Sequence, residues 1–154
     1  MKTNLKTYLI ILLSVMAFSS CSTDKTMIAK GVNLNKYQYA SLTQTRNSFG
    51  TVTDIEIEPG IYDAIESTRL KLIGAQRIND LSAEQKEKLV LAKYSATSSQ
   101  EKSVLSVSFE DYMTGKTVAS CRSSNSTAWT RQRDVDKAIR KLAKRIVKVW
   151  GKSE

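Results

Sequence analysis

The segment Arg131–Trp150 has apolar residues that recur at helical spacing. At 100° per residue these side chains fall within about 140° of one another on a helix. They are Val135, Ala138, Ile139, Leu142, Ala143, Ile146, Val149 and Trp150. The pattern predicts an amphipathic helix with one apolar stripe. Because that stripe must be buried against another element, we expect a layered domain.

Several segments before this helix are typical of strands. Leu105, Val107 and Phe109 alternate with serines, which predicts a strand with one buried face. Residues 111–116 include residue types that favour a turn. Thr117–Ser123 is therefore predicted to be the second strand of a hairpin. There we expect Cys121 to be a small buried hydrophobe. Strands are also predicted at Leu89–Ala96 and, as the first and central strand, at Lys36–Leu42.

The segment between residues 53 and 85 is predicted to begin as a strand and continue as a helix. In Thr53–Glu58, Ile55 and Ile57 alternate with acids, which would place three carboxylates on one face. Such acids either bind calcium or form a solvated edge that pairs with lysines, and the solvated edge is commoner. An amphipathic helix is predicted over Pro59–Ile73, ending at Gly74, followed by a short extended piece at residues 75–78. Ser82 and Gln85 have capping-box spacing for a brief helical turn.

These elements together predict an α/β (α+β) fold. We expect a two-layer sandwich in which two amphipathic helices pack on a mixed sheet of four to five strands. Residues 36–154 provide enough chain for a single domain.

The first twenty residues are typical of a signal peptide. Lys2 and Lys6 precede the apolar run Tyr8–Phe18, which small residues close. This run is shorter than the roughly 20 residues that a membrane-spanning helix needs. We therefore expect residues 1–20 to be cleaved during export.

The sequence Phe18-Ser-Ser-Cys21 resembles the lipobox of bacterial lipoproteins, although that family usually has leucine in place of Phe18. The resemblance implies that the Cys21 thiol carries a diacylglyceryl group and that Cys21 becomes the acylated N-terminus. We then expect a domain anchored to a membrane, the outer membrane first, and working outside the cytoplasm. The alternative is ordinary secretory cleavage. Residues 21–35, rich in small and polar side chains, are predicted to form the lipidated cysteine and a flexible spacer.

Composition excludes several classes of site. The chain has no histidine, so it contains no Ser-His-Asp or Cys-His catalytic group and no imidazole metal ligand. If Cys21 is acylated, Cys121 has no second cysteine to form an intrachain disulfide with. We predict no metal and no cofactor. The net charge of +9 indicates anionic partners in the envelope, with nucleic acid improbable outside the cytoplasm.

The predicted last helix carries most of the candidate contact residues. The side opposite its apolar stripe holds Arg133, Lys137, Arg140, Lys141, Lys144 and Lys148, with Arg145 at the border. This basic face either contacts an anionic membrane or envelope polymer or is a solvated face that aids solubility. Trp129 beside Arg131 is a candidate partner contact, since Trp and Arg are enriched at binding hot spots. Trp129 could equally close the end of the core.

A second resemblance covers residues 35–151. The lipobox, Lys36-Tyr-x-Tyr-Ala40, Gly74, Asp111-x-x-Thr-Gly-Lys116 and the final helix together resemble small envelope lipoproteins similar to the curli-secretion lipoprotein and the TolB amino-terminal domain. The resemblance implies a non-enzymatic binding or assembly module, with no functional residues to transfer.

Two other functions fit the sequence less well. A small-ligand carrier requires an apolar pocket. A glycan hydrolase requires two carboxyl groups with different pKa values facing each other across a cleft. The acids available for that role are Asp54, Glu56, Glu58, Asp63, Glu110 and Asp111. Nothing in their spacing demands this arrangement, so we predict that the protein is not an enzyme.

Overall fold

A mixed six-stranded sheet forms one layer of the protein. The computed structural model describes residues 24–44, 54–98, 103–126 and 131–153. The strand order across the sheet is β1-β6-β5-β4-β2-β3. The strands are β1 (Lys25–Ile28), β2 (Tyr39–Gln44), β3 (Lys71–Leu72), β4 (Leu89–Ser98), β5 (Ser103–Asp111) and β6 (Thr117–Asn125). Neighbouring strands are antiparallel, except that β2 is parallel to both β3 and β4.

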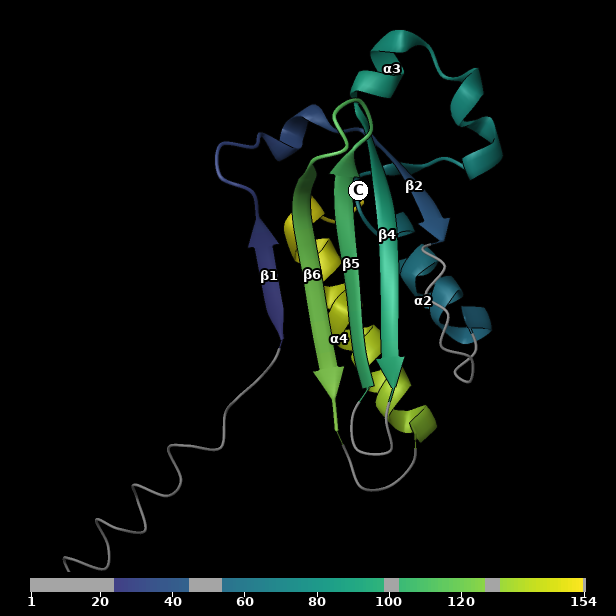
Figure 1. The fold of residues 1–154 in the computed structure, drawn as a ribbon, viewed down its shortest axis with the longest axis vertical. Helices are drawn as coiled ribbons and strands as arrows, with labels where there is room; N and C mark the ends of the chain where they lie inside the picture. Colours follow the sequence, from purple (N-terminus) through teal and green to yellow (C-terminus); the bar gives the residue numbers. More distant parts are fainter. Residues whose placement is uncertain (1–23, 45–53, 99–102, 127–130, 154) are drawn as a thin grey trace, which may run out of the picture.

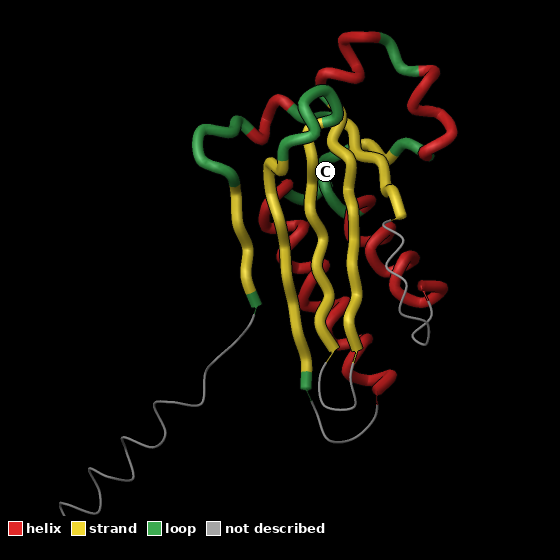
Figure 2. Tube along the Cα trace, viewed as in Figure 1, coloured by secondary structure: helices red, strands yellow, loops and turns green. Residues whose placement is uncertain are grey.

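Two helices form the second layer. Helices α2 (Asp54–Glu66) and α4 (Arg131–Trp150) lie on the same side of the sheet and leave its other face open (Figures 1 and 2). The short helix α3 (Ala83–Glu87) and the 3₁₀ turns η1 (Leu34–Lys36) and η2 (Ala75–Asp80) complete the described elements. Of the helices in the described ranges, none is both long enough and apolar enough to cross a membrane. The predicted α+β two-layer sandwich is confirmed, but the sheet has six strands instead of four to five.

The core lies between α4 and the three central antiparallel strands. Residues that face each other across the strands share a side of the sheet, so Ala92, Phe109 and Ala119 point into the same layer. Trp150, at the end of α4, packs its ring against that of Phe109, with centroids 5.1 Å apart. All four residues are buried. This contact fixes the end of the last helix on the centre of the sheet.

Predictions based on long or strongly signalled patterns are confirmed. The last helix has the predicted bounds, and the β5–β6 hairpin forms as expected. Ser82 caps α3 through a capping box with Gln85. Cys121 is fully buried on β6.

The predicted strand at Thr53–Glu58 and the predicted helix at Pro59–Ile73 are wrong in their bounds. Asp54–Glu58 is the first part of α2, and Pro59 lies inside the helix instead of in its first turn. Ile57, Ile61 and Ile65 are all buried, so the helical spacing already begins at Ile57. The helix ends at Glu66, while residues 71–72 form β3 and the predicted extended piece after Gly74 is η2.

The predicted spacer and first strand also need correction. Residues 21–35 contain β1, which pairs with β6, and the start of η1, so this segment is part of the folded domain from Lys25 onward. The strand predicted at Lys36–Leu42 begins at Tyr39 and lies one place from the sheet edge. The strand in the predicted spacer was missed because β1 is only four residues long and pairs with a strand that is distant in the sequence.

Candidate interaction surface

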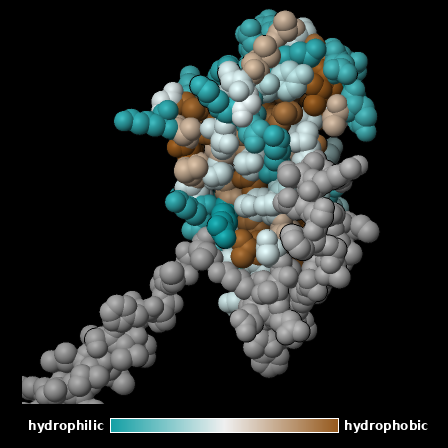
Figure 3. Space-filling view, in the orientation of Figure 1, coloured by the Kyte–Doolittle hydropathy of each residue, from teal (hydrophilic) through white to brown (hydrophobic). Residues whose placement is uncertain are grey.

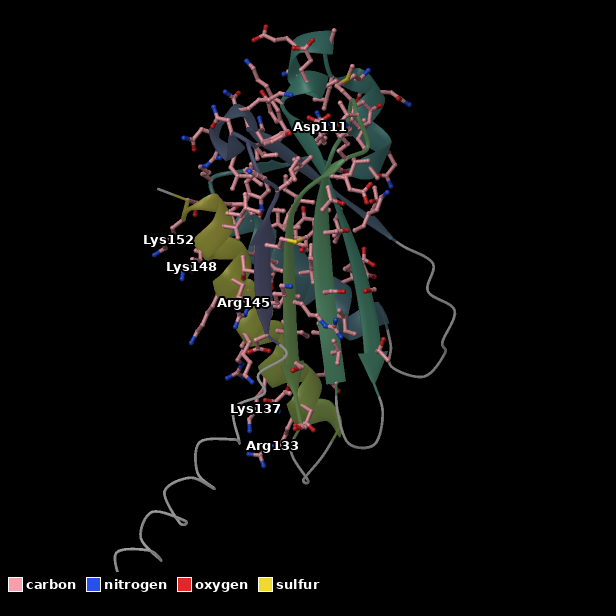
Figure 4. All side chains as sticks on the ribbon, turned by 60° about the vertical axis from the view of Figure 1, so that its left-hand side comes forward. Asp111, Arg133, Lys137, Arg145, Lys148 and Lys152 are labelled. Carbon is pink, nitrogen blue, oxygen red and sulfur yellow. The ribbon has the colours of Figure 1, made fainter. Side chains whose placement is uncertain are left out.

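The solvent side of α4 carries a row of cations. The helix buries Val135, Leu142 and Ile146 against the sheet, and its 3.6-residue period therefore turns the charged residues outward. Six cations are exposed among the described side chains of α4. Lys141 bonds to β6, and we call the other five the basic stripe: Arg133, Lys137, Arg140, Lys144 and Lys148. Figure 4 shows Arg133, Lys137 and Lys148 following one another along α4.

The charges of the basic stripe are not neutralised by the described part of the chain. Within residues 24–44, 54–98, 103–126 and 131–153, no carboxylate oxygen lies within 4.0 Å of a nitrogen atom of the stripe. Lys137, Arg140, Lys144 and Lys148 include like-charge neighbours one turn apart, and each such pair opposes the helix by about 0.2–0.5 kcal/mol. An anionic surface that meets the stripe relieves this repulsion.

Lys141 has a structural role that separates it from the stripe. Its ammonium group donates to the Ser124 carbonyl oxygen and to Asn125 Oδ1, both at 3.1 Å. The Asn125 amide nitrogen in turn donates to Asp134 Oδ1 at 2.7 Å, and both Asn125 and Asp134 are buried. Lys141 therefore ties α4 to the end of β6.

Arg145 holds the first strand in place. Its guanidinium lies 3.3 Å from Asp24 Oδ2 and also donates to Thr26 Oγ1 at 3.3 Å. The Ser124 N–H donates to Asp24 Oδ1 at 2.7 Å. Burial raises the pKa of Asp24, but the Ser124 hydrogen bond and the cations Lys141 and Arg145 outweigh it, so the pKa lies below its usual value.

A buried carboxylate anchors the opposite end of the sheet, where Figure 4 labels Asp111. Asp111 Oδ2 accepts from the Tyr37 hydroxyl at 2.8 Å and from Lys36 at 3.2 Å, while its Oδ1 accepts from the Thr114 N–H at 2.8 Å. Burial raises the pKa of Asp111, but the bonds from Tyr37, Thr114 and Lys36 lower it to about 2. Burial and the Asp111 charge raise the pKa of Tyr37 to about 12. These hydrogen bonds fasten the β5–β6 turn to η1, so the Asp111 carboxylate has a structural role.

The open face of the sheet has a hollow of about 410 Å³. Ser95 and Ser106 hydroxyls lie 2.6 Å apart in it, and Lys93 pairs with Glu110 at 2.5 Å. Figure 3 shows pale and hydrophilic residues mixed with brown ones over this face, without a continuous apolar surface. The hollow therefore differs from the enclosed apolar pocket that a small-ligand carrier needs.

Three of the six carboxylates considered for hydrolysis, those of Glu58, Glu110 and Asp111, make other contacts. Glu58 accepts from the Tyr94 hydroxyl at 3.2 Å, and Asp63 is exposed on α2. Glu110 and Asp111 are adjacent in β5 and so point to opposite faces of the sheet. The side chains of Asp54 and Glu56 lie outside the described part. No group of three His, Cys, Asp or Glu residues close enough to hold a metal occurs in the described ranges.

The remaining predicted site residues fall outside the described part. They are Cys21, Trp129 and the side chain of Arg131, whose backbone begins α4. Sequence reasoning missed the Asp24–Arg145 pair. The only local signal for it was the short run Thr26-Met-Ile28, which has the residue types of a strand.

No protein-family model and no curated protein matches the sequence. Solved structures with a similar fold include the PelC dodecamer from Paraburkholderia phytofirmans, with a TM-score of 0.50 and 10% sequence identity, covering 86% of this chain and 100% of PelC. A second PelC dodecamer from the same organism, a variant with one substituted residue, gives a TM-score of 0.44 and 10% identity, covering 80% of this chain and 98% of that one. At this identity the likeness concerns the fold alone.

Proposed function

We propose that this protein is a lipid-anchored envelope lipoprotein that works as a non-enzymatic binding or assembly module. Cys21 carries the lipid, and the basic stripe is the surface that meets an anionic envelope component. The outer membrane is the proposed location of the anchor.

The observation that carries this proposal is the basic stripe itself. Arg133, Lys137, Arg140, Lys144 and Lys148 are exposed on one side of α4 and lack carboxylate neighbours in the described ranges. Two other cations of the helix, Lys141 and Arg145, are used to hold the fold. A row that makes no ion pair within the described residues and costs repulsion suits recognition of an external anion.

The anchor supports the same function because it keeps the domain close to its partners. One acyl chain gives only marginal attachment, at about 0.8 kcal/mol per buried CH₂, whereas two or three chains make it stable. A diacylglyceryl group on Cys21 provides that stability and places the domain in the envelope.

The two cysteines provide a matched test of the anchor. Cells expressing the wild-type chain, Cys21→Ser or Cys121→Ala are fed an alkyne fatty acid and then separated into membrane and non-membrane fractions. We expect label and membrane retention in the wild type and in Cys121→Ala, because Cys121 is buried on β6. Cys21→Ser should lose both. Label and retention equal to wild type in Cys21→Ser would refute the anchor.

A further inference from the structure

The N-terminal strand lies beside the basic stripe and brings the proposed anchor to it. Three peptide units separate Cys21 from Asp24. A fully extended chain spans at most about 3.6 Å per residue, so the two Cα atoms lie within about 11 Å of each other. Asp24 is held by Arg145 and by the Ser124 N–H. An acyl group on Cys21 therefore enters the bilayer close to Arg145, in the C-terminal half of α4.

From this juxtaposition we infer that β1 and the basic stripe lie flat against the anionic phospholipid headgroups of the membrane that holds the anchor. The inference rests on the proposed lipidation of Cys21. It names the partner of the stripe as the adjacent bilayer and gives the domain a fixed orientation on it.

Charge supports this orientation. Lys25 in β1 and Lys30 just after it are exposed and add positive charge at this edge of the sheet, with Lys25 on its open face. Figure 4 shows β1 in front of α4, with Arg145 and Lys148 beside it and with Lys137 and Arg133 beyond its lower end. Anionic membranes attract such basic surfaces, and the attraction falls off within a Debye length of about 8 Å at physiological salt. The tether of at most about 11 Å is of the same order as this length, so the surface stays within one to two Debye lengths of the bilayer.

One exposed apolar side chain of β1, that of Ile28, lies on the α4 side of the strand, and Met27 beside it points to the open face of the sheet. Met27 and Ile28 in β1 are 50% and 48% exposed and are two of the four large hydrophobic residues exposed in the described ranges. Ile28 projects from the same side of β1 as Thr26, which contacts Arg145 of α4. Protein surfaces that lie in a membrane interface typically combine apolar side chains with cations.

The tether also explains why weak attraction suffices. A short link makes the second contact intramolecular, with an effective concentration on the order of millimolar. A free polyanion has no such advantage.

The competing occupant of this surface is a second copy of this chain. An edge strand such as β1 has unpaired backbone groups that can pair with another chain.

The test uses two exposed residues as fluorescent probes in the full lipidated chain. Ile28→Cys reports on the proposed contact surface, and Met113→Cys, 57% exposed in the β5–β6 turn, is the control position. The native Cys121 is buried and its pKa is raised to about 11, so the introduced thiol is labelled selectively. Each protein is placed in nanodiscs of phosphatidylglycerol and phosphatidylethanolamine, or of phosphatidylcholine alone, that contain headgroup-spin-labelled lipid.

We expect the spin label to quench the Ile28 probe at least about threefold more than the Met113 probe in anionic discs, and this ratio to fall towards one in about 0.5 M NaCl. The triple variant Lys137→Gln/Lys144→Gln/Lys148→Gln should lose the difference. A control with the same net charge, Lys71→Gln/Arg77→Gln/Lys116→Gln, should keep it, because these exposed residues lie outside β1 and α4.

Each outcome decides the inference. The mass of the chain first establishes whether Cys21 carries lipid, and its absence overturns both the anchor and the orientation. With the lipid present, equal quenching at the two positions overturns the proposed orientation but not the anchor. The same holds if quenching is unchanged by the charge substitutions and by salt. Shielding of the Ile28 probe that rises with the number of chains per disc identifies a second copy as the occupant and also overturns it.

Discussion

Arg145 of the last helix and Asp24 at the start of the first strand lie 3.3 Å apart, nitrogen to oxygen, and join the two ends of the described domain. Only 31% of the arginine side chain and 11% of the aspartate side chain are exposed. Arg145 also reaches Thr26, which pairs with Cys121 across β1 and β6. The ion pair therefore holds β1 over a fully buried thiol.

This relationship predicts that Arg145→Gln exposes Cys121. Losing the contacts to Asp24 and Thr26 should favour detachment of β1 by about 1 kcal/mol, or about fivefold in the open population. The reaction rate of Cys121 with a thiol reagent under native conditions should rise by the same factor. The control Arg140→Gln removes an exposed stripe cation and should leave the rate unchanged. Equal rates in Arg145→Gln and wild type would contradict the role assigned to the pair.

Asp111 should make stability depend on acid pH. Its pKa is about 2 in the fold against a usual 3.8, so its contribution is present above about pH 4 and is lost as pH falls towards 2. Asp111→Asn should lower the free energy of unfolding by about 2 kcal/mol near pH 7 and flatten this pH dependence. Urea unfolding across the acid range measures both. Asp63→Asn, at an exposed site on α2, should change neither, and a fully stable Asp111→Asn would refute the prediction.

Gly60 of α2 lies close to Ile139 of α4. A Cβ atom at this position would lie 2.6 Å from Ile139 Cγ2, which is a branched methyl group close to the backbone. Gly60→Ala gains up to about 1 kcal/mol of helix propensity but should cost more in overpacking, for a net loss of about 1 kcal/mol.

Trimming the partner should relieve that clash. In Gly60→Ala/Ile139→Ala the added methyl group fills space that Ile139 leaves, so the two losses should combine to less than their sum. A double-mutant cycle from urea unfolding measures the difference. If the two changes in the free energy of unfolding were strictly additive, the overpacking would not involve Ile139.

Lys141 and Lys137 lie one turn apart on α4 but should respond differently to the same substitution. Lys141→Gln removes two 3.1 Å hydrogen bonds to β6 and should lower the free energy of unfolding by about 1 kcal/mol. Lys137→Gln should change it by less than about 0.5 kcal/mol, since it only relieves like-charge repulsion. Thermal or urea unfolding of the two variants in low salt tests this. Equal losses would remove the distinction between structural and stripe cations.

Long periodic patterns made the helical layer and the hairpin predictable. The α4 stripe repeats over twenty residues, and Leu105, Val107 and Phe109 alternate through β5, so one pattern fits each segment better than any other. The acidic start of α2 shows the limit. Ile55 and Ile57 alone fit a strand, whereas the burial of Ile57, Ile61 and Ile65 against α4 and the sheet selects the helix.

By itself the sequence determined the layered fold, the amphipathic last helix with its charged side, and the expectation of a lipid anchor at Cys21. Only the tertiary structure decided that residues 25–28 join the sheet and that Lys141 and Arg145 hold the fold while Arg133, Lys137, Arg140, Lys144 and Lys148 remain exposed. Periodicity records which side of an element a residue occupies. The partner of each cation depends on segments that are remote in the chain and meet only when the edge strand closes on β6.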